Sequence, residues 1–322
     1  MKLQPESLAE LTAALAGAHA RREAVAAIDL TALARVLEYH PEDLTVTVEA
    51  GITLAALQTE LGRHGQWLPV DPPGGDRLTV RDLIDANPSG PRRFAHGTVR
   101  DHVIGLAAVM ADGTLIHSGG KVVKNVAGYD LAKLFIGGGG SLGVVVEVTF
   151  KLRPLPELER FLALSCGSPE EAEARLDAIA GSELSLESLD LHGRAGGGTT
   201  ELTLVAGFAG AREDVAWQVT QAGLLGLTRE SSREYETRFW ADPTPVQCVS
   251  VLPSRLISAV RQMPGIPFLA RAANGVIYHR GPAVPIAIAP GPLRLMHRLK
   301  ETFDPRQILP AVLPPAALAP RP

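Results

Sequence analysis

The sequence predicts a mixed fold of helices and strands, of the α/β or α+β class. Short apolar segments that alternate like strands are separated by segments whose apolar residues recur at helical spacing. A glycine run at 137–140 is followed by Val144, Val145 and Val146, a β-branched run that is typical of a buried strand. The chain has 322 residues, which is enough for two domains with sizeable cores. Short strands that alternate with helices therefore predict helices packed on sheets.

The first helix is predicted to begin after Ser7. Ser7 and Glu10 fit a capping box, and Leu8, Leu11 and Leu15 form an apolar stripe behind it. Further elements follow from the same rules of spacing and turn chemistry. Up to residue 117 they are a short strand at 24–30, a short helix at 31–39, a strand at 44–49 ending at Gly51, a helix at 53–64, a loop at 71–76, and a hairpin of 104–110 and 114–117 across Ala111-Asp112-Gly113.

Pro154 and Pro156 mark a domain boundary, because the pattern of elements changes beyond them. We expect one domain at 1–155, a second at 156–310, and a proline-rich tail at 311–322 that is extended or disordered. The glycines at 196–198 are expected to form a hairpin turn or a flexible loop. The predicted elements of the second domain are an apolar segment at 158–165, helices at 170–179 and 214–224, and strands at 201–208, 246–252 and 275–278.

The composition is that of a soluble enzyme or enzyme subunit. The net charge is −4, and the basic pair Arg92-Arg93 is isolated and expected to be solvated, so nothing points to nucleic acid. No apolar run approaches the roughly 18 residues of a membrane span. The N-terminus lacks the basic start and apolar core of a signal peptide. A cytoplasmic location is therefore the expectation.

The two cysteines, Cys166 and Cys248, are interpreted as structural thiols. They cannot hold an iron–sulfur cluster that needs four thiolates. No histidine or cysteine lies near them at the spacing of a zinc site. We predict no metal site in this chain, so a partner must carry any metal centre that receives electrons from it.

The glycine run at 137–140 has two interpretations. Glycines permit positive φ angles and close approach of the backbone to a ligand, which indicates a site lined by backbone atoms. The alternative is a tight turn between two core elements. The glycine run alone does not separate them.

Longer strings around this run resemble a known family. They are LTVTVEAGITLAALQTEL from Leu44, GQWLPVDPP from Gly65, SGPRRFAHGTVRDHVIGLAAVMADGTLIHSGGKVVKNVAGYDLAKLF from Ser89, and GSLGVVVEVTFKLRPLP from Gly140. Together they resemble the PCMH-type flavin-binding domain of the vanillyl-alcohol-oxidase family, and within it the FAD-binding subunit of bacterial glycolate oxidase. The second half resembles the family only through LKETFDPRQIL, from Leu299.

The resemblance implies a fold and a function. The fold is α+β, with a PCMH-type FAD-binding domain of two α/β subdomains and a C-terminal cap domain built on an antiparallel sheet. The function is that of a flavoprotein subunit that oxidises a small 2-hydroxy acid and passes electrons to partners. Those partners are a second flavin subunit and an iron–sulfur subunit, through which the chain would lie at the periphery of the inner membrane.

The resemblance also implies where FAD would lie, along three segments and one further glycine. No catalytic residue follows from it. The cofactor-binding residues expected are Thr79, Val80, Arg81, Asp82, Ala86, Asn87, Ser89, Gly90, Gly97, Gly140, Ser141, Gly143, Val144 and Val145.

The sequence departs from the family where the FAD diphosphate is bound. Relatives carry a glycine-rich loop after the first helix, and its backbone N–H groups hold the diphosphate. Only AHARRE, at 18–23, stands there in this chain. Elsewhere Gly138 and Gly139 stand where side chains are usual, and Ser141 replaces a threonine. Losing the loop predicts weaker FAD binding, because each charge-assisted hydrogen bond contributes roughly 1.5–3 kcal/mol.

Arg81 and Asp82 replace a glycine pair that is common in the family. Asp82 would repel a nearby diphosphate and would cap a helix beginning at Leu83. Arg81 has three interpretations. It pairs with a phosphate, it fills the space of the cofactor, or it points to solvent or forms an ion pair with Asp82 or Asp85.

Other polar residues are weaker candidates. Arg100 and Asp101 are expected to form a local pair, and His96, His102 and His117 to be structural. Two functions stay open: the flavoprotein subunit described above, and a flavin-poor paralogue that serves as an assembly subunit. Residues expected to orient the glycine loop are Lys124, Asn125, Tyr129 and Asp130, and those expected to line a substrate pocket are Arg238, Trp240, Arg255 and His279.

Overall fold

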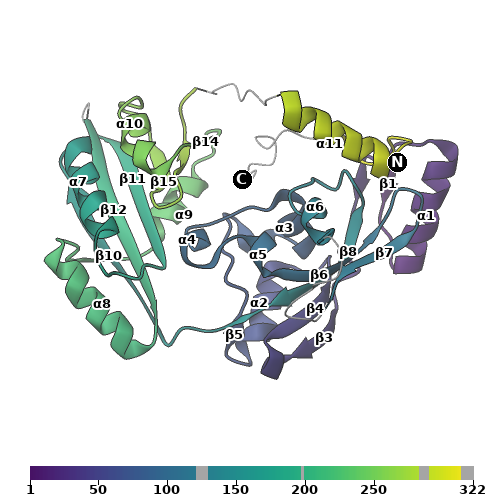
Figure 1. The fold of residues 1–322 in the computed structure, drawn as a ribbon, viewed down its shortest axis with the longest axis horizontal. Coiled ribbons are helices and arrows are strands. Elements are labelled where there is room, and N and C mark those ends of the chain that lie inside the picture. Colours follow the sequence, from purple (N-terminus) through teal and green to yellow (C-terminus); the bar gives the residue numbers. More distant parts are fainter. Residues whose placement is uncertain (121–129, 197–198, 283–289, 313–322) are drawn as a thin grey trace.

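A computed structural model describes residues 1–120, 130–196, 199–282 and 290–312. It confirms the α+β class, with mainly antiparallel sheets. Figure 1 shows two bodies side by side, each built on its own sheet, and a C-terminal helix that returns from the second body to the first. Each body has a separate hydrophobic cluster of buried side chains.

The first body is built on a five-stranded antiparallel sheet in the order β3-β4-β8-β6-β7. Its central strand β8 is the β-branched run that the sequence predicts, and Val144, Val145 and Phe150 are buried in the core. Two small sheets join to it, a parallel pair β1-β2 and an antiparallel pair β5-β9. The strands are β1 (Lys2–Leu3), β2 (Ala27–Ile28), β3 (Val36–His40), β4 (Thr45–Glu49), β5 (Gln66–Trp67), β6 (Val103–Val109), β7 (Leu115–Gly119), β8 (Val144–Lys151) and β9 (Arg153–Pro154).

The first helix of this body begins where its capping residue predicts. Ser7 Oγ accepts a hydrogen bond from Glu10 N–H at 3.2 Å, whereas the Glu10 carboxylate binds the N–H of Glu6 and not that of Ser7. Thr53 caps the next helix in the same way. The helices are α1 (Leu8–Arg21), α2 (Leu54–Gly62), α3 (Val80–Ala86), α4 (Arg93–His96), α5 (Val99–His102) and α6 (Ala132–Phe135), with 3₁₀ turns at Pro41–Asp43 and Gly75–Arg77.

The helix predicted at 31–39 is wrong. Asp29 holds a turn there, because its carboxylate accepts hydrogen bonds from the backbone and hydroxyl of Thr31. The chain then extends into β3, which pairs with β4 from Val36 to His40. Partly buried Val36 and Tyr39 pack against the core, and this packing of a β-branched and an aromatic residue favours the strand.

The second body is built on a seven-stranded antiparallel sheet in the order β13-β10-β12-β11-β15-β16-β14. Helices α7, α8 and α10 cover one face, where their apolar residues join the strands in one cluster. Helix α9 lies on the opposite face, which it covers only in part. The strands are β10 (Leu158–Cys166), β11 (Ser188–Gly196), β12 (Thr199–Gly210), β13 (Arg229–Ser231), β14 (Gln247–Ser250), β15 (Phe268–Arg271) and β16 (Val276–His279), and the helices are α7 (Pro169–Ala180), α8 (Arg212–Leu224), α9 (Glu234–Ala241) and α10 (Leu256–Val260), with a 3₁₀ turn at Pro253–Arg255.

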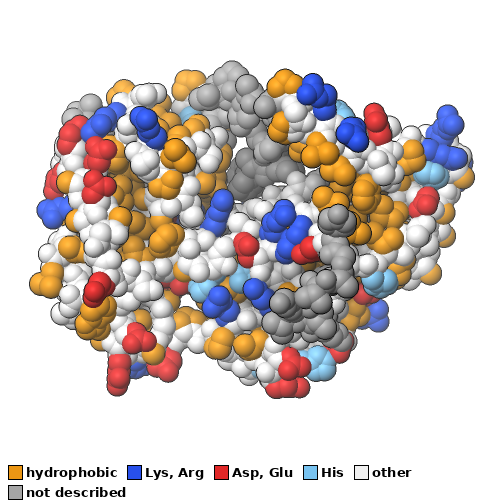
Figure 2. Space-filling model, viewed as in Figure 1, with side chains coloured by type: hydrophobic (Ala, Val, Ile, Leu, Met, Phe, Trp, Pro, Cys, Tyr) orange, Lys and Arg blue, Asp and Glu red, His pale blue; other side chains and the backbone are white. Residues whose placement is uncertain are grey.

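The C-terminal helix α11 (Pro290–Phe303) packs on the first body. The ring of Phe303 meets that of Phe135 edge to face at 6.2 Å, and Ile308 and Leu309 are buried in the core of the first body. Leu295 of α11 is exposed, and Figure 2 shows hydrophobic side chains gathered along this helix and below it. Within the described ranges, no helix is both long enough and apolar enough to cross a membrane.

Candidate functional site

The segment expected to meet a diphosphate, Thr79 to Asp82, forms the start of α3. Thr79 is the N-cap, and Asp82 completes a capping box by accepting a hydrogen bond from Thr79 N–H at 2.8 Å. The helix therefore begins at Val80 and not at Leu83 as predicted. The N–H groups of Val80 and Arg81 donate to carbonyls at 50–52, in the turn after β4, and those of Asp82 and Leu83 donate to Thr79. Every N–H that would face a diphosphate here is already bonded within the chain.

Arg81 follows the third interpretation, an ion pair within the chain. Its Nε lies 3.2 Å from Asp85 Oδ2, and its Nη1 donates to the carbonyl oxygen of Ile28. The guanidinium thus joins α3 to β2, the first strand after α1. The helix α1 continues through Arg21, so residues 18–21 form its last turn where relatives are expected to carry the glycine-rich loop.

The glycine run at 137–140 caps the other end of α3. Gly137 N–H donates to the carbonyl of Ile84 at 2.8 Å, and Gly139 N–H donates to that of Asp85 at 2.9 Å. Both glycines have positive φ, which residues with a side chain rarely adopt. For these two residues the tight-turn interpretation holds, because their donors satisfy the carbonyls left unpaired at a helix C-terminus.

The remaining predicted glycines are required by contacts within the chain. A Cβ atom on Gly90 would lie 1.9 Å from the Asp71 carbonyl oxygen, and one on Gly143 would lie 2.9 Å from the Phe135 ring. Gly97 has a φ of 82° and packs against Asp101, while Gly140 has a φ of 69° and faces Asp85. Valine at positions 90 and 143 would therefore disturb packing whether or not a cofactor binds.

The other predicted residues have structural contacts as well. Asn87 ends α3 with a φ of 44°, and its buried Oδ1 has no partner among the described residues. Ser89 Oγ lies 3.5 Å from Arg93 Nη1, and the carbonyl of Ser141 accepts a hydrogen bond from the buried Lys300 Nζ at 2.9 Å. Ala86 is the last residue of α3, and Val144 and Val145 are buried in β8.

The charge of this region also opposes a diphosphate. The carboxyl of Asp85 lies beside Arg81, and burial raises its pKa to about 6, against the opposing effect of Arg81. Asp82 adds a second carboxylate one turn away. The residues at 79–85 therefore do not fit a diphosphate held by backbone donors, because the donors are engaged and the neighbouring acids would repel it.

A second group of charges joins the two bodies. Arg92 lies between Asp71 and two acids of the second body, with its Nε 3.0 Å from Glu187 Oε1. His96 Nε2 lies 3.0 Å from the same carboxylate. The expectation that Arg92 is solvated is wrong, because its guanidinium also stacks 4.6 Å from the Trp67 ring centre. Arg92 and Glu187 are 95 positions apart in the sequence, so no local pattern predicts that they pair.

This network continues into the sheet of the second body. Arg233 Nη2 binds Asp71 at 2.8 Å and Glu236 at 3.1 Å, and Glu236 also binds Arg271. Arg271 binds Asp190 at 2.8 Å. Burial raises the pKa of Asp71 to about 6 despite the two arginines beside it. The charges therefore form one connected chain from the 71–92 region to the centre of the second sheet.

Comparison with known proteins finds a family model that matches part of the first body. Residues 10–119 match the family described as FAD binding domain. Over these residues the chain is thus similar to an FAD-binding domain. Its fold is shared with alkyldihydroxyacetonephosphate synthase, solved in two crystal forms, at TM-scores of 0.70 and 0.72 with 17% and 15% identity. Those alignments cover 95% of this chain and 75–76% of the synthase.

Curated proteins that are similar to this chain include subunits of oxidases. Glycolate oxidase subunit GlcD of Bacillus subtilis is 39% identical over 159 residues, which are 48% of this chain and 34% of that protein. Subunit GlcE of Escherichia coli is 35% identical over 191 residues, which are 58% of this chain and 54% of that protein. A probable mitochondrial D-lactate dehydrogenase of Danio rerio is 38% identical over 131 residues, 40% of this chain and 26% of that protein. The matches thus span about a quarter to a half of these relatives.

The weaker predictions have mixed outcomes. Arg100 donates to the Lys133 carbonyl, and the Asp101 carboxylate accepts a hydrogen bond from Thr98 N–H. Arg100 and Asp101 therefore do not form the expected pair. Both cysteines are free thiols, and only Cys166 is fully buried. Lys124, Asn125 and Tyr129 lie outside the described residues, as do Gly197 and Gly198. Asp130 lies 3.9 Å from Lys133 Nζ, His102 is buried and His117 exposed.

The four residues expected to line a substrate pocket do not gather in one place. Arg238 lines a pocket of about 950 Å³ on the open face of the second sheet, and Trp240 lines a cleft of about 850 Å³ between α9 and the 70–77 loop. His279 is buried in β16, and Arg255 is exposed in a 3₁₀ turn. The sequence did not predict His192, Tyr235 or the other residues around Arg238, because they come from strands and a helix that carry no motif.

His40, Glu42 and Asp43 each place one potential metal-ligand atom within 4.8 Å of the others. The three lie on the surface at a 3₁₀ turn, and His40 is already bonded to Glu38. Exposed groups of this kind are common without a metal, so we assign no site there.

Replacing Asp85 by asparagine is expected to change how stability depends on pH. The folded pKa of about 6 lies above the ordinary value of 3.8, so Asp85 favours the folded state below pH 4, and this contribution is lost as pH rises through 6. Between pH 4 and pH 7 the free energy of unfolding of Asp85→Asn should therefore fall by up to about 3 kcal/mol less than that of the wild type. Urea unfolding of both proteins at pH 4 to 7 measures it. Asp76→Asn, in an exposed loop, is the control, and a difference between wild type and Asp85→Asn that does not vary with pH would contradict the assignment.

Proposed function

We propose that the chain is the FAD-binding subunit of a glycolate-oxidase-like 2-hydroxy-acid dehydrogenase, and that it passes electrons to a partner subunit. The observation that carries this proposal is the match of residues 10–119 to the FAD binding domain family. The chain's similarity to two glycolate oxidase subunits and to D-lactate dehydrogenases supports a small 2-hydroxy acid as the substrate. When bound, FAD would supply the hydride acceptor for such an oxidation.

The proposed partners are a second flavin subunit and an iron–sulfur subunit. The sequence supports a partner for the metal centre, because its two cysteines cannot ligate a cluster that needs four thiolates. We propose a cytoplasmic complex held at the periphery of the inner membrane through these partners. Co-purification of the tagged chain from its own cells, followed by iron and flavin analysis of the complex, tests the assembly.

A second function is favoured by the geometry at α3. The backbone donors at 79–83 are bonded within the chain, and Arg81 is paired with Asp85 and the Ile28 carbonyl. A chain in this state would serve as a structural subunit that keeps the FAD-binding fold without retaining FAD. In that case the flavin that performs the oxidation would belong to a partner.

The visible spectrum of the purified chain separates the two functions. Flavin absorbance in stoichiometric amount, or restoration of it by added FAD, supports the FAD-binding subunit. A colourless protein that stays folded and takes up no FAD at millimolar concentration supports the structural subunit. Circular dichroism on the same sample verifies that a colourless protein is folded.

Replacing Arg81 by glycine is expected to tighten FAD binding about tenfold. The substitution removes the guanidinium that lies between α3 and β2. This opens space for the cofactor, although Asp85 loses its ion-pair partner. A tenfold change corresponds to about 1.4 kcal/mol. Fluorescence titration with FAD measures it, with Arg77→Gly in the exposed neighbouring loop as control. A tenfold loss of affinity would show instead that Arg81 turns to bind the diphosphate.

A further inference from the structure

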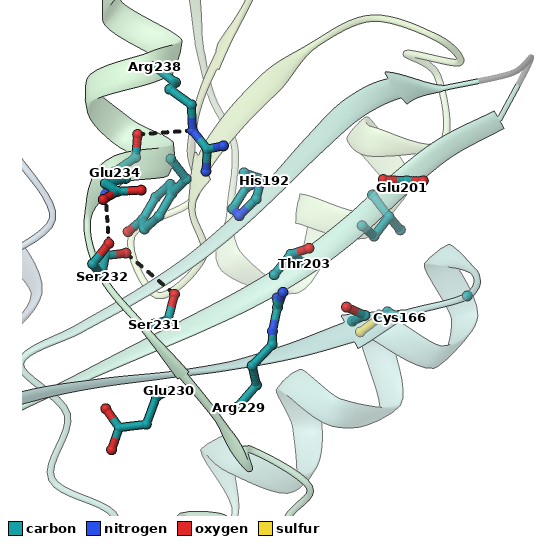
Figure 3. Close-up of a pocket in the computed structure, with 14 residues that line it drawn as sticks. Cys166, His192, Glu201, Thr203, Arg229, Glu230, Ser231, Ser232, Glu234 and Arg238 are labelled. Atoms are coloured by element: carbon teal, nitrogen blue, oxygen red, sulfur yellow. Dashed lines mark hydrogen bonds between the residues drawn. The ribbon is translucent and has the colours of Figure 1, made fainter.

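The open face of the second sheet holds a pocket that belongs to the second body alone. Its volume is about 950 Å³, and all of its lining residues lie between 165 and 238. Figure 3 shows it between α9 on one side and the strands β10, β12 and β13 on the other. None of the residues expected to hold FAD contributes to its lining, so it is separate from the cofactor region.

The floor of the pocket is a row of polar side chains set by strand register. Ser165 pairs directly with Thr203, and Thr203 pairs with His192 on its other side. Directly paired residues of antiparallel strands project from the same face, so two hydroxyls and an imidazole lie side by side. The neighbouring apolar row of Ala163 and Val205 is covered by α9.

Two arginines stand over this floor from opposite sides. Arg229 comes from edge strand β13, and Figure 3 shows its guanidinium directed toward Thr203. Arg238 comes from α9, and Figure 3 shows its guanidinium on the side of His192. In the described part of the chain the Arg229 side chain forms no hydrogen bond or ion pair, and the Arg238 side chain only donates Nε to the Glu234 carbonyl at 3.4 Å. Among the residues that the structure describes, no carboxylate forms an ion pair with either guanidinium.

The imidazole of His192 is held in place from behind. Its ring stacks on that of Tyr235 with the centres 4.8 Å apart and the planes 7° from parallel. The Tyr235 hydroxyl donates to Asp190 Oδ2 at 2.6 Å, and Asp190 is bound to Arg271. A polar group fixed by a buried network in this way is preorganised for a ligand, because little ordering is left to occur on binding.

The acids around the pocket limit the charge of its ligand. Glu201, Glu230 and Glu234 also line it, and all three are exposed. Figure 3 shows the carboxylate of Glu230 directed away from Thr203. Because three glutamates face two arginines, the pocket has no net positive charge, and it should repel a dianion such as phosphate more strongly than a monocarboxylate held by the two guanidinium groups.

We propose that this pocket binds a small hydroxylated monocarboxylate. The carboxylate would bind the guanidinium groups of Arg229 and Arg238, since a planar guanidinium matches a carboxylate with two parallel hydrogen bonds. The ligand hydroxyl would bind the hydroxyl of Thr203, beside the His192 ring. The proposal does not rest on FAD binding or on the oxidation proposed above, because the site is complete within the second body.

Isothermal titration of the full chain with glycolate, D-lactate and inorganic phosphate tests the site. We expect glycolate or D-lactate to bind and phosphate to bind at least tenfold more weakly. Arg238→Gln and Arg229→Gln should each weaken carboxylate binding about tenfold or more. Arg255→Gln, which changes an exposed arginine of the same body, should leave it unchanged.

Three outcomes would overturn the proposal. They are absence of binding by either carboxylate, phosphate binding as tight as carboxylate binding, and equal effects of Arg238→Gln and Arg255→Gln. Circular dichroism of each variant excludes unfolding as the cause of lost binding. Arg238→Lys, which keeps the charge but not the planar fork, should retain part of the affinity if the contact is direct.

Discussion

Replacing Arg271 by methionine is expected to lower the free energy of unfolding by about 3–5 kcal/mol. The Arg271 side chain is 3% exposed and binds Asp190 and Glu236, which are 1% and 9% exposed. The substitution removes the only cation in contact with Asp190 among the described residues and leaves buried charge without a counterion. Urea unfolding followed by circular dichroism measures the loss.

The matched control is Arg261→Met. Arg261 also contacts two carboxylates, Glu170 at 3.1 Å and Glu173 at 2.8 Å, but on the surface. Exposed ion pairs contribute only about 0–1 kcal/mol, so this variant should be nearly as stable as the wild type. Equal losses in the two variants would show that burial does not govern the effect. If Arg271→Met does not fold, Arg271→Lys, which retains the charge, should still fold with reduced stability.

Replacing Lys300 by methionine is expected to cost a similar amount, about 3–5 kcal/mol. Lys300 Nζ donates to the Ser141 carbonyl at 2.9 Å, to the Leu309 carbonyl at 3.1 Å and to Asp304 Oδ2 at 2.6 Å. Asp304 is fully buried, and without the ammonium its remaining hydrogen-bond donors among the described residues are the N–H groups of Ile308 and Leu309. Thermal and urea unfolding measure the change.

Arg298→Met provides the control for this second prediction, because Arg298 lies on the exposed side of the same helix. Its replacement should change stability by less than about 0.5 kcal/mol. A Lys300→Met protein as stable as Arg298→Met would contradict the role assigned to the buried pair. Lys300→Met/Asp304→Asn, which removes both charges, should recover part of the loss.

The sequence predicted most elements whose periodicity is clear. The helices at α2, α7 and α8 and the strands at β4, β6 and β8 lie close to the predicted residues, because apolar spacing and capping residues determine them locally. The predicted helix at 31–39 failed because pairing with β4 outweighs the helical spacing of its leucines. Pairing partners distant in sequence leave no trace in a local pattern.

The candidate site could be predicted only in outline. The family strings indicated an FAD-binding domain, and the residues at 79–82 indicated a changed diphosphate region. They did not indicate that Gly137 and Gly139 bind the carbonyls of α3, or that Arg81 reaches the Ile28 carbonyl. They also did not indicate the Arg229–Arg238 pocket, since that pocket depends on the register of three strands. Such register follows from tertiary packing and not from spacing along the chain.

The contact between the two ends of the chain affects the order in which the protein can fold during synthesis. Val25 N–H donates to the Ile308 carbonyl at 2.7 Å, and Arg306 donates to the His19 carbonyl at 2.6 Å. The body made first on the ribosome is therefore completed by residues made after the whole second body. Domains usually fold one after another as they emerge from the ribosome. Here the core of the first body stays incomplete until residues 290–309 have been made. Nascent chains that end before residue 290 should consequently need chaperones to protect that core.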